Sequence, residues 1–191
     1  WLKTHYPAEF LAANLSSEMD NTDRVVTLLA ATRNMNIEIL PPDVNTSFEE
    51  FRAVNDKCIA YGLAAIKNLG AKASSSISEY RQLNGDFKTV YDIMQIGVNV
   101  INKKGIESLV LAGACDNLEG HRAQQFEIID DALRWGQKFG KEAASSQESL
   151  FGGDALVAAI APPTLPEVEE WSAEVCLKHE KETIGFYLSG D

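Results

Sequence analysis

Apolar and polar positions follow a helical period over the first part of the chain. Phe10, Leu11 and Leu15 fall on one face of a helix that can begin at Pro7, since proline suits a first helical turn. Residues 20–23 supply an N-cap and acidic first-turn groups for a second helix, which we expect to end at 34–36. Residues 37–40 then alternate as a short strand does.

The pattern changes twice after the two prolines at 41–42. Segments 51–54 and 58–61 have strand character and flank Asn55-Asp56-Lys57, which favours a hairpin turn. From there the pattern is helical, and Gly70 and Gly113 interrupt it. The expected helices cover residues 62–68, 72–83, 88–95, 102–111, 121–139 and 172–183, with a last strand at 184–188. The predicted fold class is therefore mainly α with a small β element.

Residues 140–170 differ in composition from the helical segments before them. Serines, a glycine pair and a proline pair punctuate a tract of small residues. Such a tract is typical of a flexible linker, and we expect it to be mobile.

Net charge changes the picture only when it is resolved along the chain. The 191 residues carry a net charge of −11, which by itself argues against nucleic acid. Residues 61–106 contain six basic and three acidic side chains, a net charge of +3, so the rest of the chain carries −14. A basic segment on an acidic background keeps DNA among the possible partners.

The chain offers few residues for catalysis or for metal binding. The three cysteines and three histidines are widely spaced, so we expect no metal site and reduced thiols in a cytoplasmic protein. The paired carboxylates suit helix caps and solvated surfaces, and no serine lies in a nucleophile elbow. No apolar run is long enough to span a membrane. The opening residues do not resemble a signal peptide and read as the middle of a chain, so we expect a segment of a larger protein.

Two stretches have a helix-hairpin-helix pattern, residues 64–73 around Gly70 and residues 109–118 around Gly113. A tight turn at a helix N-terminus exposes backbone N–H groups to a phosphate oxygen, and a nearby lysine adds charge. Such contacts bind the DNA backbone independently of sequence. The pattern alone fits a plain helical hairpin better, with each glycine serving only as a C-cap. His121, at a helix start, could contact a phosphate or cap its helix.

Residues 147–151 read Gln-Glu-Ser-Leu-Phe. Two apolar anchors beside a glutamine, placed in a polar tract, are typical of a short linear motif that fills a pocket on a partner. The five residues taken alone fit better a chance docking of Leu150 and Phe151 on this chain's own surface.

Several blocks, in order and in register, resemble the alpha subunits of bacterial DNA polymerase III. They are WLKTHYPAEF at 1–10, ILPPDVN at 39–45, YGLAAIKNLG at 61–70, ESLVLAGACD at 107–116 and GFYLSG at 185–190. The resemblance implies that residues 1–45 end a fingers domain, 46–61 are a connector of short strands, 62–139 form a tandem helix-hairpin-helix domain for duplex DNA, 140–170 are a linker carrying the clamp-binding motif, and 171–191 lead to an OB-fold.

The same resemblance implies functions for individual residues. The expected DNA contacts are Lys67, Asn68, Gly70, Ala71, Lys72, Gly113, Asn117, His121 and Arg122, and the expected contacts with the beta sliding clamp are Gln147, Leu150 and Phe151. The family's catalytic aspartates, which use Mg²⁺, would precede Trp1. No catalytic residue, metal ligand or cofactor is therefore expected in this segment of a DNA-directed DNA polymerase, whose partners would include other replicase subunits.

Lys72 departs from the family pattern, because many relatives have a second glycine there. Two alternatives also remain open: a stand-alone helix-hairpin-helix module for DNA repair, and a purely structural helical module. If the tandem interpretation is right, the two hairpin turns should lie side by side and face one surface.

Overall fold

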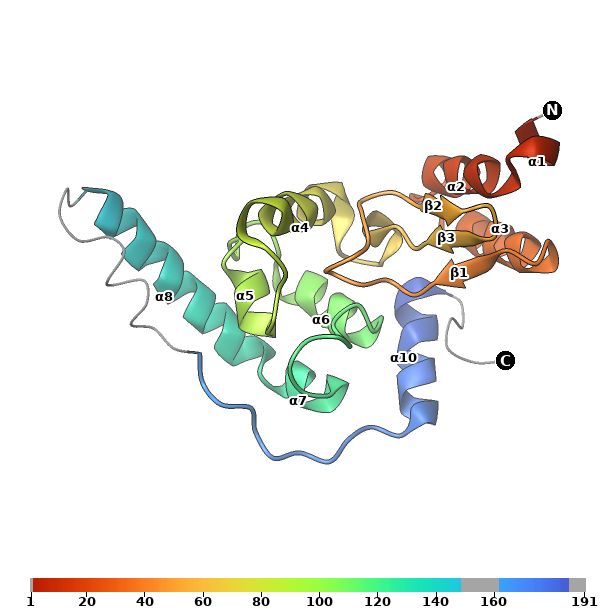
Figure 1. Cartoon of the computed structure of the whole chain (residues 1–191). Helices are drawn as coiled ribbons and strands as arrows, with labels where there is room; N and C mark the ends of the chain where they lie inside the picture. The colour runs from red at the N-terminus through yellow and green to blue at the C-terminus, as the bar shows by residue number, and fades with distance from the viewer. Residues whose placement is uncertain (1, 149–161, 186–191) are drawn as a thin grey trace.

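The computed structural model describes residues 2–148 and 162–185. The described part is mainly helical with one three-stranded sheet, which confirms the predicted fold class. Figure 1 shows α1 to α3 and the sheet at one end, α4 to α7 in the middle, and α8 projecting at the other end.

The N-terminal helices form as their apolar spacing predicts. The side chain of Asn21 accepts a hydrogen bond from the N–H of Arg24 at 3.2 Å, so the predicted N-cap is confirmed. Leu11, Leu15 and Leu29 are buried against the sheet side of this layer. The elements are α1 (Leu2–His5), α2 (Pro7–Ser17) and α3 (Thr22–Asn34).

Three of the four predicted strands meet in one small mixed sheet. Strand β3 (Cys58–Ala60) lies in the centre, antiparallel to β2 (Arg52–Asn55) and parallel to β1 (Glu38–Leu40). The side chain of Asn55 accepts a hydrogen bond from the N–H of Lys57 at 2.9 Å, which closes the predicted hairpin turn.

The helices of the middle region depart from the prediction at their ends. The helix expected at 62–68 is only a short 3₁₀ turn, because Gly62 is extended and packed on the backbone at Phe51, while Asn68 has φ of +63°. The following helix begins at Gly70, two residues before Lys72. The elements are η1 (Leu63–Ala65), α4 (Gly70–Asn84), α5 (Val90–Met94), α6 (Lys103–Leu111) and α7 (Arg122–Glu127).

The expected single helix at 121–139 is two helices, because α7 ends before Ile128 and α8 (Ile129–Glu148) starts after it. Helix α8 also continues through residues 140–148, so the linker prediction is wrong there. This stretch contains alanine, glutamate, glutamine and lysine, which favour helices. Residues 149–161 of the predicted linker lie outside the described residues, and 162–172 have no helix or strand.

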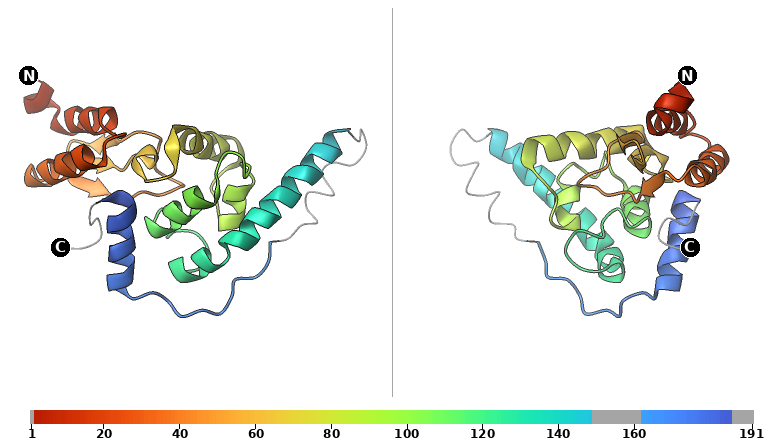
Figure 2. Two further views of the ribbon diagram at one scale, coloured as in Figure 1. Left: turned by 180° about the vertical axis from the view of Figure 1, so that it is seen from behind. Right: turned by 45° about the vertical axis from the view of Figure 1, so that its right-hand side comes forward.

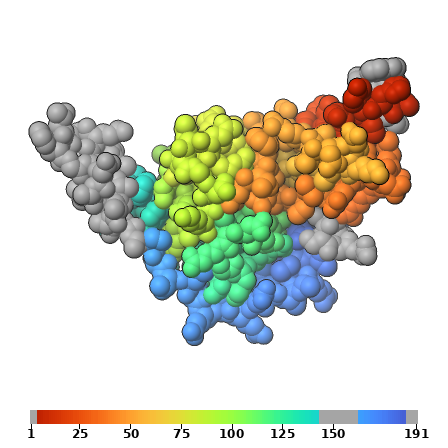
Figure 3. All heavy atoms as spheres, in the orientation of Figure 1, coloured from red at the N-terminus to blue at the C-terminus, as the bar shows by residue number. Residues whose placement is uncertain are grey.

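The helix expected at 172–183 is α10 (Ala173–Ile184), and the side chain of Ser172 caps it. Ile184 ends this helix, and residues 186–188 of the expected last strand lie outside the described residues. Residues 162–172 pass α7 on the way, where the side-chain amide of Gln124 donates to the carbonyl of Pro166 at 2.9 Å. Figures 2 and 3 show this blue segment and α10 along the lower face of the green helices.

One apolar core joins these parts. Leu15 of α2, Ile59 of β3, Ile106 of α6 and Ile184 of α10 belong to it, and each is at most 1% exposed. The expected domain boundaries after residues 45 and 61 therefore do not coincide with a break in packing, and they stay predictions.

Candidate nucleic-acid interface

The first hairpin turn, residues 66–70, is anchored by its apolar residues and exposes its polar ones. Ile66 and Leu69 are buried. Asn68 and Gly70 have φ of +63° and +72°, which reverses the chain into α4. Lys67, Asn68, Gly70, Ala71 and Lys72 are all exposed, as their predicted role requires.

The N-terminus of α4 has the local features of an anion site. No side chain caps it. The first N–H groups of an α-helix have no partner within the helix and sit at the positive end of its dipole. Lys67 and Lys72 flank this end, so side-chain charge and backbone donors lie together.

The first turn is held from two sides. The backbone N–H of Lys67 donates to the carbonyl of Thr183 in α10 at 3.1 Å, so this amide is used inside the protein and only the side chain faces solvent. The side-chain amide of Asn68 donates to the hydroxyl of Ser108 in α6 at 3.2 Å. The turn therefore rests on α6.

The contact with α6 brings a second set of lysines to the first turn. Lys104 is four residues before Ser108 and so lies on the same face of α6, the face that meets Asn68. Asn102 caps this helix by accepting from the N–H of Gly105 at 2.9 Å. Asn102, Lys103 and Lys104 are exposed. We call Lys67, Lys72, Lys103 and Lys104 the basic surface.

A glycine turn also precedes α6, and the sequence analysis missed it. Gly97 has φ of +115° in the connection between α5 and α6, residues 95–101. The signal was present, since Gly97 is followed five residues later by a helix cap and two lysines. The residues around Gly97 do not resemble those that flank Gly70 and Gly113, so the pattern shared by those two glycines does not indicate this turn.

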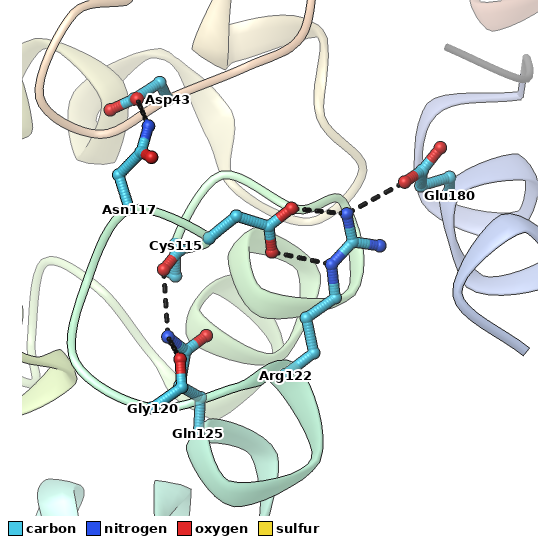
Figure 4. A network of polar contacts seen from close by, with 8 residues as sticks. Asp43, Cys115, Asn117, Gly120, Arg122, Gln125 and Glu180 are labelled. Carbon is cyan, nitrogen blue, oxygen red and sulfur yellow. Dashed lines mark hydrogen bonds and ion pairs between the residues drawn. The ribbon is translucent and has the colours of Figure 1, made fainter. Parts of the chain in front are cut away.

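The Gly113 turn, residues 112–121, is built differently. Gly113 is buried with φ of +80°, and the guanidinium of Arg122 packs against it. Arg122 donates to both carboxylate oxygens of Asp116 at 2.7 and 2.6 Å and to Glu180 of α10 at 2.9 Å (Figure 4). Burial opposes the charge, but the bonds to Asp116 and Glu180 outweigh it and hold the pKa of Arg122 above its ordinary value.

The other polar groups of the Gly113 turn are also used internally (Figure 4). The amide of Asn117 donates to Asp43 at 2.5 Å. The buried amide of Gln125 donates to the carbonyls of Cys115 and Gly120 at 2.9 and 3.1 Å. Asn117 and Arg122 are therefore bound to carboxylates of this chain. Glu119, which is exposed, adds a negative charge to the surface of the turn.

His121 caps α7. Its ring nitrogen Nδ1 accepts from the N–H of Gln124 at 3.4 Å, and the Gln124 side chain accepts from the N–H of His121 at 3.2 Å. The capping interpretation of His121 is therefore the one that the geometry supports.

That the two turns lie side by side stays a prediction. The side chain of Asn68 bonds to Ser108 in the second half of α6, and the Gly113 turn follows the end of that helix at Leu111. The carbonyl of Asn68 also lies beside Gly105, which brings the first turn near the start of α6. Of the predicted clamp residues, Gln147 is in the last turn of α8, and Leu150 and Phe151 lie outside the described residues.

The described residues were also compared with what a metal site and a membrane-spanning helix require. Within residues 2–148 and 162–185, no group of three or more His, Cys, Asp or Glu side chains could hold a metal ion. Among the helices described, none is long and apolar enough to cross a membrane.

Comparison with known proteins agrees with these features. A family model described as a helix-hairpin-helix motif matches residues 36–125, from β1 into α7. DNA polymerase III subunit alpha of Vibrio cholerae is 40% identical over all 191 residues, that of Neisseria meningitidis 41%, and that of Escherichia coli K12 36%. The chain belongs to the bacterial DNA polymerase III alpha subunit family. It spans 16% of the length of each of these relatives, so it corresponds to one segment of them.

Proposed function

We propose that this segment binds the sugar-phosphate backbone of duplex DNA through the basic surface, without reading base sequence. The observation that carries the proposal is the packing of Asn68 against α6, with its side chain bonded to Ser108 and its carbonyl beside Gly105. This packing brings the uncapped start of α4 near the lysines at the start of α6. Phosphate oxygens bind lysine ammonium groups and helix N-termini in this way.

The proposed surface differs from the one expected from sequence. The first turn is kept with Lys67, Asn68, Gly70, Ala71 and Lys72. Gly113, Asn117 and Arg122 are left out because they hold the fold together. Lys103 and Lys104 replace them.

Salt-dependent binding of a short duplex of arbitrary sequence tests the proposal. Each phosphate contact contributes about one unit to the slope of log K against log salt. Lys67→Ala, Lys72→Ala and Lys104→Ala should each weaken binding roughly threefold and reduce that slope by about 1. Lys88→Ala, which removes an exposed lysine beside the acidic Gly113 turn, is the matched control.

Two results would contradict the proposal: duplex binding that does not depend on salt, or equal effects of Lys88→Ala and Lys104→Ala. In either case the purely structural module becomes the better interpretation. The DNA-repair accessory module is the less suitable rival, since the whole chain aligns with polymerase subunits.

We also propose that the segment serves DNA replication inside a DNA-directed DNA polymerase and attaches it to the beta sliding clamp. The nucleotidyl transfer itself, with its Mg²⁺-binding carboxylates and its other replicase partners, would belong to the rest of that protein. Helix α8 favours the clamp role because it carries Gln147 to its last turn, away from the body of the protein (Figure 1).

A further inference from the structure

The basic surface contains one lysine that is already paired. The ammonium of Lys103, the first residue of α6, lies 2.6 Å from a carboxylate oxygen of Asp130 in the first turn of α8. Their side chains are 51% and 62% exposed, so both groups can exchange this partner for one from solution. The helix that leads to the candidate clamp motif thus contacts the candidate DNA surface.

The neighbouring carboxylate has a different partner. Asp131 is exposed, lies in the same first turn of α8, and pairs with Arg134 within that helix. The two adjacent aspartates therefore carry the same charge in similar exposure, but only Asp130 contacts the basic surface.

We infer that Asp130 binds Lys103 where a DNA phosphate would otherwise bind it. Helix α8 thereby determines how many lysines of the basic surface are available to a duplex. This inference rests on the proposed DNA binding by that surface. A carboxylate and a phosphate oxygen bind an ammonium group with the same charge-assisted geometry. A given N–H group of the Lys103 ammonium can bind either the carboxylate or the phosphate oxygen, but not both at once.

The pair changes the charge that DNA meets. While Asp130 is bound, Lys103 and Asp130 together contribute no net charge, and Lys67, Lys72 and Lys104 remain as cations of the surface. Glu107, one helical turn along α6, also acts on Lys103 electrostatically. The hydrogen bond to Asp130 raises the pKa of Lys103 against a smaller effect of desolvation, and the field of the two carboxylates raises it further.

A two-by-two set of variants tests the inference by duplex affinity across roughly 50 to 200 mM salt. Asp130→Asn should tighten binding about threefold and steepen the salt slope by about 1, because Lys103 then neutralises one more phosphate and a counterion is released from the DNA. Asp131→Asn removes the same charge one residue away and should tighten binding less than about 1.5-fold. Lys103→Ala should weaken binding less in the natural sequence than in the Asp130→Asn background, where it should abolish the gain.

Equal gains from Asp130→Asn and Asp131→Asn would overturn the inference, and so would an equal loss from Lys103→Ala in both backgrounds. These outcomes leave the proposed function intact if Lys67→Ala and Lys104→Ala still weaken binding. If those two variants bind DNA as the natural chain does, the proposed DNA binding by the basic surface is wrong. The inference about Asp130 is then wrong as well. Thermal unfolding of the two aspartate variants, expected to be equal, checks that α8 is intact.

Discussion

Arg122 and Glu180 form an ion pair of 2.9 Å although 58 positions separate them in the sequence. The Glu180 side chain is 2% exposed and that of Arg122 13%. Because Asp116 binds the same guanidinium, Arg122 links the Gly113 turn to α10. The residue that sequence suggested as a DNA contact is therefore a connection between two parts of the fold.

Loss of this connection should cost stability. Arg122→Ala leaves the buried carboxylate of Glu180 without its cation, and removal of one partner of a buried pair lowers the free energy of unfolding by about 3 kcal/mol. Arg24→Ala is the control, since its contact with Glu18 is 3.6 Å long and largely exposed, and it should cost less than about 0.5 kcal/mol. Urea unfolding measures both. Similar losses in the two variants would show that the Arg122 pair does not hold α10.

Two glycines of α8 should respond in opposite directions to the same substitution. A Cβ at Gly136 would lie 2.9 Å from the Cβ and carbonyl oxygen of Met94, so Gly136→Ala should push α8 from α5 and cost about 1 to 3 kcal/mol. A Cβ at Gly140 meets nothing within 4 Å, so Gly140→Ala should stabilise the helix by about 0.5 to 1 kcal/mol. Thermal unfolding distinguishes the two. A stabilising Gly136→Ala would mean that α8 does not pack closely there.

Local signals predicted most of the fold. The cap at Asn21, the helix starts near residues 102 and 172 and the apolar spacing of the helices depend on residues within one or two turns, so they could be predicted directly from the sequence. The end of α8 was missed because serines near residue 145 suggested a linker, whereas helix propensity and the preceding packed turns continue the helix to Glu148.

Only part of the candidate site could be predicted, because the rest depends on contacts between residues that are far apart in the sequence. Lys67 and Lys72 beside Gly70 are a local pattern, and the structure exposes them as expected. The side-chain amide of Asn117 donates a hydrogen bond to Asp43, 74 positions away, and no local sequence pattern indicates this bond. The same holds for the contacts of Asn68 with Ser108 and Gly105, which place the first turn against α6 and add the start of that helix to the surface.

The thiols should differ in reactivity and in their effect on alkaline stability. Burial, reinforced by Asp116, raises the pKa of Cys115, which is fully buried, whereas Cys176 is partly exposed. In the folded chain an aromatic disulfide reagent should label Cys176 rapidly and Cys115 only after unfolding. Cys176→Ser, which should remove the fast phase, is the control.

The sign of the pH effect follows from the raised pKa. Cys115 stays neutral in the folded state while the unfolded chain ionises near pH 8.5, so its contribution to stability is present below that pH and is lost as the pH rises above it. The free energy of unfolding should fall by up to about 1.4 kcal/mol per pH unit for this proton. Rapid labelling of Cys115 in the folded chain would contradict its burial.

The clamp proposal predicts a loss of binding from two side chains. Leu150 and Phe151 follow directly after α8, and two apolar anchors of a short motif supply most of its affinity. Leu150→Ala with Phe151→Ala should therefore weaken binding to the beta sliding clamp at least about tenfold, measured with immobilised clamp, while duplex affinity stays unchanged. Leu156→Ala with Val157→Ala, an apolar pair in the same tract, should leave clamp binding as it was. Equal losses from both pairs would mean that residues 147–151 do not form a specific motif.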